Sequence, residues 1–388
     1  MTIADSSVQK HSEIFNRGPP DRLQTIAGLM RSERVNVGRR ATLAVAFGWL
    51  PLAAFAAAQT MFMHDGAFAS FATDYGVHAR SLIAAPLLII AEAVCAPRLS
   101  AVAAHFTSSG IVAPVDEPAF DRIVKSTLWL LDSLVVEAVL LALAAGIVFA
   151  LWLRLPLAAF PRWHGVEATS AAGWWQNFVS APILLMLVLG WIWRIALWMR
   201  FLFLVSRLRL QLIAAHPDHA GGLRFLGISV QAFSVVAFAM SVIIAGAAAN
   251  RVMHDGASIL SFQFAILGAV ILAVAIFVGP LFVFMDPLIA TWQRGILEYG
   301  ALARGVGMHL ERKWLPQSPG PNALATPDFS AATDLYSIAA NAYAMNVIPF
   351  TLMNIAALIV AMLLPFIPVV LMSVPFSEIV HKLAGVLL

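Results

Sequence analysis

Long apolar runs alternate with short polar segments along the chain. Seven runs contain about the 20 residues that a helix needs to cross a hydrocarbon core. They cover residues 41–62, 79–97, 127–153, 178–199, 226–249, 259–285 and 346–372. The runs are rich in leucine, alanine and valine without strand-like alternation, and in lipid a backbone must satisfy its own hydrogen bonds. The pattern predicts an all-α integral membrane protein, a seven-helix bundle.

The composition agrees with this class. Hydrophobic residues make up 61% of the chain and charged residues 12%, and the mean hydropathy is +0.85, well above that of soluble domains. The net charge of +3 does not indicate nucleic-acid binding. The single cysteine, Cys95, excludes an internal disulfide. No cofactor is expected.

Lysine and arginine are distributed unevenly between the loops. With a cytoplasmic N-terminus, eighteen of them fall in inside segments and five in outside segments. Because cytoplasmic loops carry the excess of positive charge, this predicts the N-terminus inside and the C-terminus outside. Residues 1–40 would form a basic cytoplasmic segment, and residues 373–388 an amphipathic tail on the outer side.

A pentapeptide, MHDGA, occurs at 63–67 and again at 253–257. Each copy follows an outgoing span, and each returning span contains Pro-Leu, four apolar residues and an acid, which is Glu92 in the first copy and Asp286 in the second. The pattern predicts a parallel internal repeat of residues 41–225 and 226–372, related by an axis along the membrane normal.

The duplicated histidine and aspartate allow two interpretations. Asp tolerates turn conformations and Gly permits positive φ, so each copy can simply turn the chain. Alternatively, the imidazoles and carboxylates of the two copies meet and bind a divalent cation. The residues of that metal hypothesis are His64, Asp65, His254 and Asp255.

Acids inside membrane spans are costly, so their presence suggests a function. Asp132 and Glu137 lie within the predicted third span, and Glu137 is near its middle. Glu137 could line a pathway, or it could fasten helices through Arg194 or Arg200. Glu92 and Asp286 lie near the inner ends of their spans, where a solvated helix end is an equally simple explanation.

The seventh span combines amides with prolines that interrupt its hydrogen-bond ladder. Broken helices with inward amides often line an aqueous path, although amides also hold bundles together. On a continuous helix Asn346 and Asn354 would share one polar face. These two residues and Thr351 are the predicted pathway positions of this span.

The stretch HPDHAGGLRFLG, residues 216–227, lies on the predicted cytoplasmic side. Turn chemistry alone explains its Pro, Asp and Gly residues. The positive end of the fifth helix together with nearby arginines could instead bind a phosphate or an anionic lipid headgroup. That site would use Arg207, Arg209, Gly221, Gly222 and Arg224. The motif resembles an HPD-x-x-GGL signature of uncharacterised bacterial membrane proteins, which implies a bacterial inner-membrane location.

Two segments predict a helical layer on the cytoplasmic side. The apolar run of the fourth span continues with few breaks to Ala215, which would give a projecting helix if it is continuous. Residues 289–315, within the insert 286–345, have helical spacing of apolar positions, and residues 316–327 read as a loop. Such a layer would join subunits of a homo-oligomer. The layout resembles that of insect-chemoreceptor-type channels, which are tetramers.

Three classes of function remain. The repeat, the intramembrane acids and the broken last span favour an ion channel or transporter. The cytoplasmic helices favour a sensor or scaffold that binds a cytoplasmic partner. A metal-dependent membrane enzyme is the third class, but the chain has no HExxH motif and no phosphate loop.

Overall fold

The helices are long and apolar enough for a multi-pass membrane protein. The computed structural model describes residues 37–154, 162–164, 170–315 and 327–373. Within these ranges six helical segments could cross a membrane, and the bent pair α16 (Leu352–Leu363) and α17 (Phe366–Ser373) makes a seventh. The single β-type pairing in the same ranges joins Val112 and Leu210. The predicted all-α class is confirmed. Most of the predicted N-terminal segment and C-terminal tail lies outside the described residues.

The first span consists of two helices, α3 (Val37–Gly48) and α4 (Leu50–Met63). Pro51 at the start of α4 has no N–H to donate to the carbonyl of Phe47. The indole of Trp175 donates to that carbonyl instead, at 2.8 Å, and the Ser180 hydroxyl donates to Gly48 O, also at 2.8 Å. Side chains of the fourth span therefore satisfy the backbone where the first span breaks.

The second and fourth spans have the same local design. After the short helix α5 (Ala67–Ala72), the second contains α6 (Tyr75–His78), η1 (Ala79–Ala84) and α7 (Ala85–Ser108). The fourth contains α10 (Ala171–Trp175), η5 (Gln176–Ser180) and α11 (Ala181–Val205). In each, a π-helical turn immediately precedes an α-helix whose second residue is proline. A proline removes one backbone donor, so the pattern of backbone hydrogen bonds changes from α-helical to π-helical in the turn before it.

The third span differs from the prediction. Residues 127–153 do not form one helix, because α8 (Glu117–Leu131) ends at Asp132 and α9 (Leu134–Arg154) starts two residues later. Asp and Ser compete with the helix for backbone hydrogen bonds, which explains a break at Asp132 and Ser133. The short helices η2 (Pro114–Asp116) and η4 (Arg162–His164) flank this pair.

The fourth span ends earlier than a continuous apolar run would allow. Helix α11 stops at Val205, so the projecting helix to Ala215 does not form. The following segment pairs with residues 111–113: Gln211 N donates to Ile111 O at 2.7 Å and Ala113 N donates to Arg209 O at 3.1 Å. Asp116 Oδ2 also accepts from Arg209 N at 2.9 Å. These contacts replace the helical hydrogen bonds and hold the loop against the bundle.

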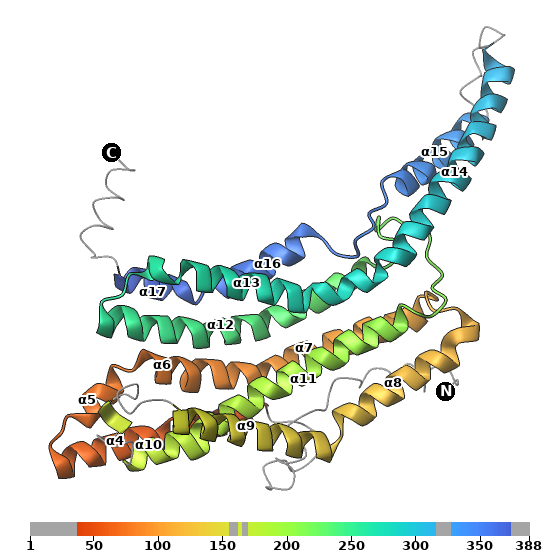
Figure 1. Cartoon of the computed structure of the whole chain (residues 1–388). Coiled ribbons are helices and arrows are strands. Elements are labelled where there is room, and N and C mark those ends of the chain that lie inside the picture. The colour runs from red at the N-terminus through yellow and green to blue at the C-terminus, as the bar shows by residue number, and fades with distance from the viewer. Residues whose placement is uncertain (1–36, 155–161, 165–169, 316–326, 374–388) are drawn as a thin grey trace, which may run out of the picture.

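Helix α12 (Gly227–Asp255) lies at the centre of the bundle (Figure 1). It packs against α6, α7, α16 and α17. Its start is the short helix η6 (Arg224–Leu226), and the chain beyond its end forms η7 (Ile259–Phe262), α13 (Gln263–Phe277) and η8 (Gly279–Phe284). Helix α12 therefore contacts helices that precede it in the chain, α6 and α7, and helices near the C-terminus, α16 and α17.

A helical hairpin extends beyond one end of the bundle. Helices α14 (Met285–Trp314) and α15 (Pro327–Tyr343) lie side by side and rise away from the other helices (Figure 1). The prediction of a helix over 289–315 is confirmed. Most of the predicted loop 316–327 lies outside the described residues.

Candidate functional site

Three charged side chains from three spans meet inside the bundle. Glu92 of α7 lies 2.7 Å from Arg40 Nη1 of α3 through Oε2 and 2.7 Å from Arg194 Nη1 of α11 through Oε1. The side chains of both arginines are less than a tenth exposed, and that of Glu92 is 12% exposed. The guanidinium of Arg194 also lies 5.1 Å from the centre of the Trp191 ring. We name Arg40, Glu92 and Arg194 the charged triad.

The charged triad revises the predicted roles of its members. Glu92 was expected at a helix end, yet it is a buried ion-pair centre. Arg194, a possible partner of Glu137, is paired with Glu92. Asp286, the predicted repeat counterpart of Glu92, is exposed in the first turn of α14. Sequence reasoning missed Arg40, whose only signal is its place at the start of an apolar run.

The acids of the third span lie beside its break. Glu137 is only 1% exposed, as a buried functional carboxylate would be. However, it lies in the first turn of α9 and not in the middle of a continuous span. Asp132 is half-buried and caps the C-terminus of α8. The break thus separates the two acids, with Asp132 at the end of α8 and Glu137 at the start of α9.

The predicted polar face of the seventh span does not form. Asn346 is exposed and lies in the connection between α15 and α16, where its N–H donates to His219 O at 2.7 Å. Thr351 and Asn354 form a capping box at the start of α16. Asn354 Nδ2 also donates to Gly227 O at 3.3 Å, which ties α16 to α12. In this structure the Asn354 side chain caps α16 and joins its start to that of α12.

The two MHDGA copies form turns. Gly66 and Gly256 both adopt left-handed conformations, with φ of 70° and 65°, so the turn interpretation is confirmed. Asp65 accepts from Gln59 Nε2 at 2.7 Å within its own turn, whereas His254 Nε2 lies 3.5 Å from Thr73 Oγ1. No group of three histidine, cysteine, aspartate or glutamate side chains suited to a metal ion occurs among the described residues. The four residues of the metal hypothesis are therefore not brought together.

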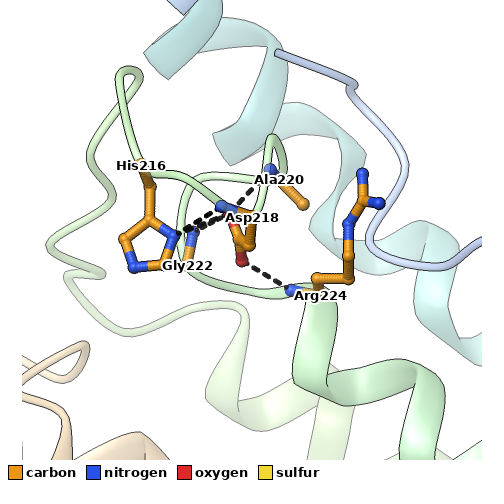
Figure 2. Close-up of polar contacts among 5 residues, drawn as sticks. All are labelled: His216, Asp218, Ala220, Gly222 and Arg224. Carbon is orange, nitrogen blue, oxygen red and sulfur yellow. Dashed lines mark hydrogen bonds and ion pairs between the residues drawn. The ribbon is translucent and has the colours of Figure 1, made fainter. Parts of the chain in front are cut away.

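The HPD loop, residues 216–223, is organised by one carboxylate (Figure 2). Asp218 Oδ1 accepts from the backbone N–H groups of Ala220 at 2.8 Å and Gly222 at 3.1 Å. Its Oδ2 accepts from Arg224 N at 3.1 Å. His216 Nδ1 lies 2.8 Å from Asp218 Oδ1. The loop is thus folded around the carboxylate of its own Asp218.

Tight backbone turns allow this arrangement. His219, Gly221 and Gly222 all have positive φ, of 53°, 64° and 96°. At Gly221 an added Cβ would lie 3.1 Å from Met345 Cε and 3.2 Å from Leu288 Cδ2, so a side chain has little room there. The loop is packed between the start of α14 and the connection that leads to α16.

The predicted anion site is changed by this geometry. The backbone donors of Gly222 and Arg224, which would have held an external phosphate, are occupied by Asp218. The side chain of Arg224 points away from the carboxylate (Figure 2). Arg207 and Arg209 are exposed, and the Arg207 guanidinium lies 4.8 Å from the Phe203 ring centre. The exposed side chains of Arg207 and Arg209 could still contact a headgroup.

Ionisation of Asp218 stabilises the loop. Burial opposes the charged form, but the hydrogen bonds from Ala220, Arg224, Gly222 and His216 outweigh it and lower the pKa of this carboxyl below its ordinary value. The stabilisation is therefore complete above the ordinary pKa and is lost as the pH falls through the lowered one.

Replacing Asp218 by asparagine tests whether the ionised carboxylate stabilises the HPD loop. The amide leaves one backbone donor without an acceptor, so the free energy of unfolding at neutral pH should fall by about 1–2 kcal/mol. Thermal or chemical unfolding of purified protein measures it, with Asp286→Asn as the exposed control, expected within about 0.5 kcal/mol of wild type. The difference in the free energy of unfolding between Asp218→Asn and wild type should become smaller at acidic pH. An equal deficit at acidic pH would contradict a role for the charge.

Comparisons of the chain with protein families, with curated proteins and with solved structures find no match. The assignment of a function therefore depends on the geometry of the charged triad, the HPD loop and the hairpin. Among these, the charged triad is the feature that a purely structural bundle has least need for, since well-packed apolar residues stabilise a helix interface as well or better.

Proposed function

We propose that the protein is a membrane transporter or ion channel for a small charged solute, with the charged triad as the charged element of its path. In the charged triad, a carboxylate lies between two buried guanidinium groups, and the three side chains come from three separate spans. This observation supports the proposal. Ionisable residues inside spans are expensive and commonly mark ion or substrate pathways. The buried carboxylate of Glu137 is a second pathway residue of the proposal.

Several features of the arrangement belong to the same proposal. The bias of lysine and arginine favours a cytoplasmic N-terminus and an outer C-terminus in a bacterial inner membrane. The duplicated MHDGA segments favour a parallel repeat. The projecting hairpin favours a homo-oligomer, and so does the resemblance of the predicted layout to that of insect-chemoreceptor-type channels. The exposed Arg207 and Arg209 favour contact with an anionic lipid headgroup.

Flux through liposomes that contain purified protein tests the function. Wild type should conduct or exchange at least one ion among a panel of cations and anions, and Glu92→Gln should reduce that flux by about tenfold or more. Asp286→Asn removes the exposed counterpart of the same acid, and its flux should stay within about twofold of wild type. Glu92→Asp retains the charge on a shorter side chain. If it folds but its flux falls, the position of the carboxylate is required and loss of folding is not the cause.

Two outcomes of the flux measurement would contradict the proposal. If wild type carries no ion at any membrane potential, transport is rejected for these solutes. If Glu92→Gln is folded and conducts like wild type, the charged triad is a structural fastener and the path lies elsewhere. Monodispersity on size exclusion and an unfolding transition confirm that each variant is folded.

A cytoplasmic sensor or scaffold is the second candidate function. The observation that favours it is the projecting α14–α15 hairpin, on which Leu297, Leu302 and Leu315 are exposed. Shallow space of about 490 Å³ between its helices is bordered by Arg304, Glu311 and Tyr336. If the wild-type protein carries no flux, the sensor or scaffold function is favoured over transport.

A further inference from the structure

A buried carboxylate that sequence analysis did not single out joins the two halves of the chain. Asp74, 5% exposed, precedes α6 and accepts from Val77 N at 2.9 Å. It also accepts from the Asn250 amide of α12 at 2.8 Å and from the Trp163 indole at 3.0 Å. One side chain therefore connects the start of the second span, the end of the fifth span and the connection after the third.

The contact between the second and fifth spans is reciprocal. Asn250 donates to Asp74 through Nδ2 and accepts from Gly76 N through Oδ1 at 3.2 Å. One turn further along α12, His254 of the second MHDGA copy reaches Thr73 Oγ1, and its ring lies 6.5 Å from that of Tyr75. We name the mutual contact of Asp74, Gly76 and Asn250 the outer bridge.

Small residues bring the two helices close enough for this bridge. A Cβ at Gly76 would lie 2.9 Å from Asn250 Nδ2, and one at Gly246 would lie 2.4 Å from Ala79 Cβ. Both glycines are thus required by the close approach. A contact of this kind has a fixed register, so it is either made in full or broken.

The carboxylate is held in its charged form. Burial disfavours ionisation of Asp74, but the bonds from Asn250, Val77 and Trp163 and the charge of Arg80 outweigh it and lower its pKa below the ordinary value. A charged carboxylate and a primary amide are both well hydrated when exposed. Opening the bridge exchanges protein hydrogen bonds for water, which changes the free energy far less than exposing an apolar contact of the same size.

The opposite end of α12 is held by a different set of contacts. Asn354 bonds to Gly227 O, and Asp218 of the HPD loop accepts from Arg224 N just before the helix starts. The aromatic rings of Phe106, Phe225 and Phe284 pack together at this end, with centroids 5.2 and 6.0 Å from that of Phe106. A movement that pivots about these contacts would separate the helices at the outer bridge.

We propose that the outer bridge is a gate contact, which must open for a solute to enter the bundle from the side of the MHDGA turns. The proposal rests on the transport function and adds the place where access is controlled. It assigns Asp74 and Asn250 to the gate and keeps the charged triad as the deeper, charged part of the path.

The first experiment measures opening without any need for flux. Val77 is fully buried beside the bridge, so a cysteine there reports opening by its reaction with a maleimide, in a Cys95→Ser background and in nanodiscs. Adding Asp74→Asn should raise the labelling rate by about tenfold. Asp65→Asn removes an exposed acid of the neighbouring turn and should leave the rate unchanged. Asn250→Ala serves as a second opening variant if Asp74→Asn does not fold.

The second experiment prevents opening. Thr73→Cys and His254→Cys place two exposed thiols across the bridge while Asp74 and Asn250 stay intact. A short bis-methanethiosulfonate reagent should abolish flux in the double variant, leave both single variants active, and be reversed by a reductant.

The two experiments separate the possible failures. Unchanged Val77→Cys labelling in both opening variants overturns the gate, and so does full flux in the crosslinked protein. If wild type has no flux but the labelling rises as expected, the transport proposal fails and the bridge remains a contact that opens.

Discussion

Replacing Glu92 by glutamine should lower the free energy of unfolding by about 3–5 kcal/mol, the largest effect expected of a single substitution in this chain. Glutamine keeps the shape of the side chain but removes the negative charge between Arg40 and Arg194. Both guanidinium groups are buried, so their charges would remain in an apolar bundle without the carboxylate that lies 2.7 Å from each. Thermal unfolding in detergent measures the loss.

A combined variant shows whether this cost arises from removing the carboxylate while both buried guanidinium groups remain. When Glu92→Leu is made together with Arg40→Met and Arg194→Met, no buried charge of the triad remains, and stability should recover to near or above that of wild type. Asp286→Asn, at the matched exposed acid, should change stability by less than about 0.5 kcal/mol. A triple variant less stable than Glu92→Gln would contradict the explanation.

The same variants separate stability from function. A triple variant that folds as well as wild type but carries no flux would show that the charged triad is kept for transport, since apolar residues replace it without cost to the fold. Equal flux in the triple variant and wild type would leave the triad no transport role. The stability and flux of one protein thus decide between a fastener and a pathway element.

The membrane spans were predictable because length and hydropathy are properties of a single helix. The break at Asp132 and Ser133 and the end of α11 at Val205 were not, because at both places other hydrogen bonds compete with those of the helix. At Val205 the deciding partner is the segment 111–113, about 100 residues away. An apolar run marks where a helix can form but not where tertiary contacts end it.

The partners of the buried charges could not be predicted for a related reason. Which side chain meets Glu92 depends on the rotation and height of three helices, and the sequence specifies neither directly. Arg40 looked like one of many basic residues that set topology, yet it points into the bundle. Conversely, the turn chemistry of Asp218 and of the MHDGA glycines was predictable because it is local.

Helix α14 offers the second large effect, through a pair of glycines with opposite surroundings. Gly295 is buried, and a Cβ there would lie 2.2 Å from Ala214 Cβ, in the segment that follows α11. Gly305, ten residues further along the same helix, has nothing within 4 Å of its ideal Cβ. The same substitution, glycine to alanine, should therefore have opposite signs at the two positions.

Gly295→Ala should lower the free energy of unfolding by about 2–3 kcal/mol, because the overlap of two methyl groups forces α14 away from the loop. Gly305→Ala should raise it by about 0.5–1 kcal/mol, because alanine restricts the unfolded chain and favours the helix. Combining Gly295→Ala with Ala214→Gly removes the overlap and should restore most of the loss. Unfolding transitions of these three variants and of wild type measure these differences. If Gly295→Ala proves as harmless as Gly305→Ala, the hairpin is not anchored at Ala214, and its fixed position relative to the bundle would have to depend on other contacts.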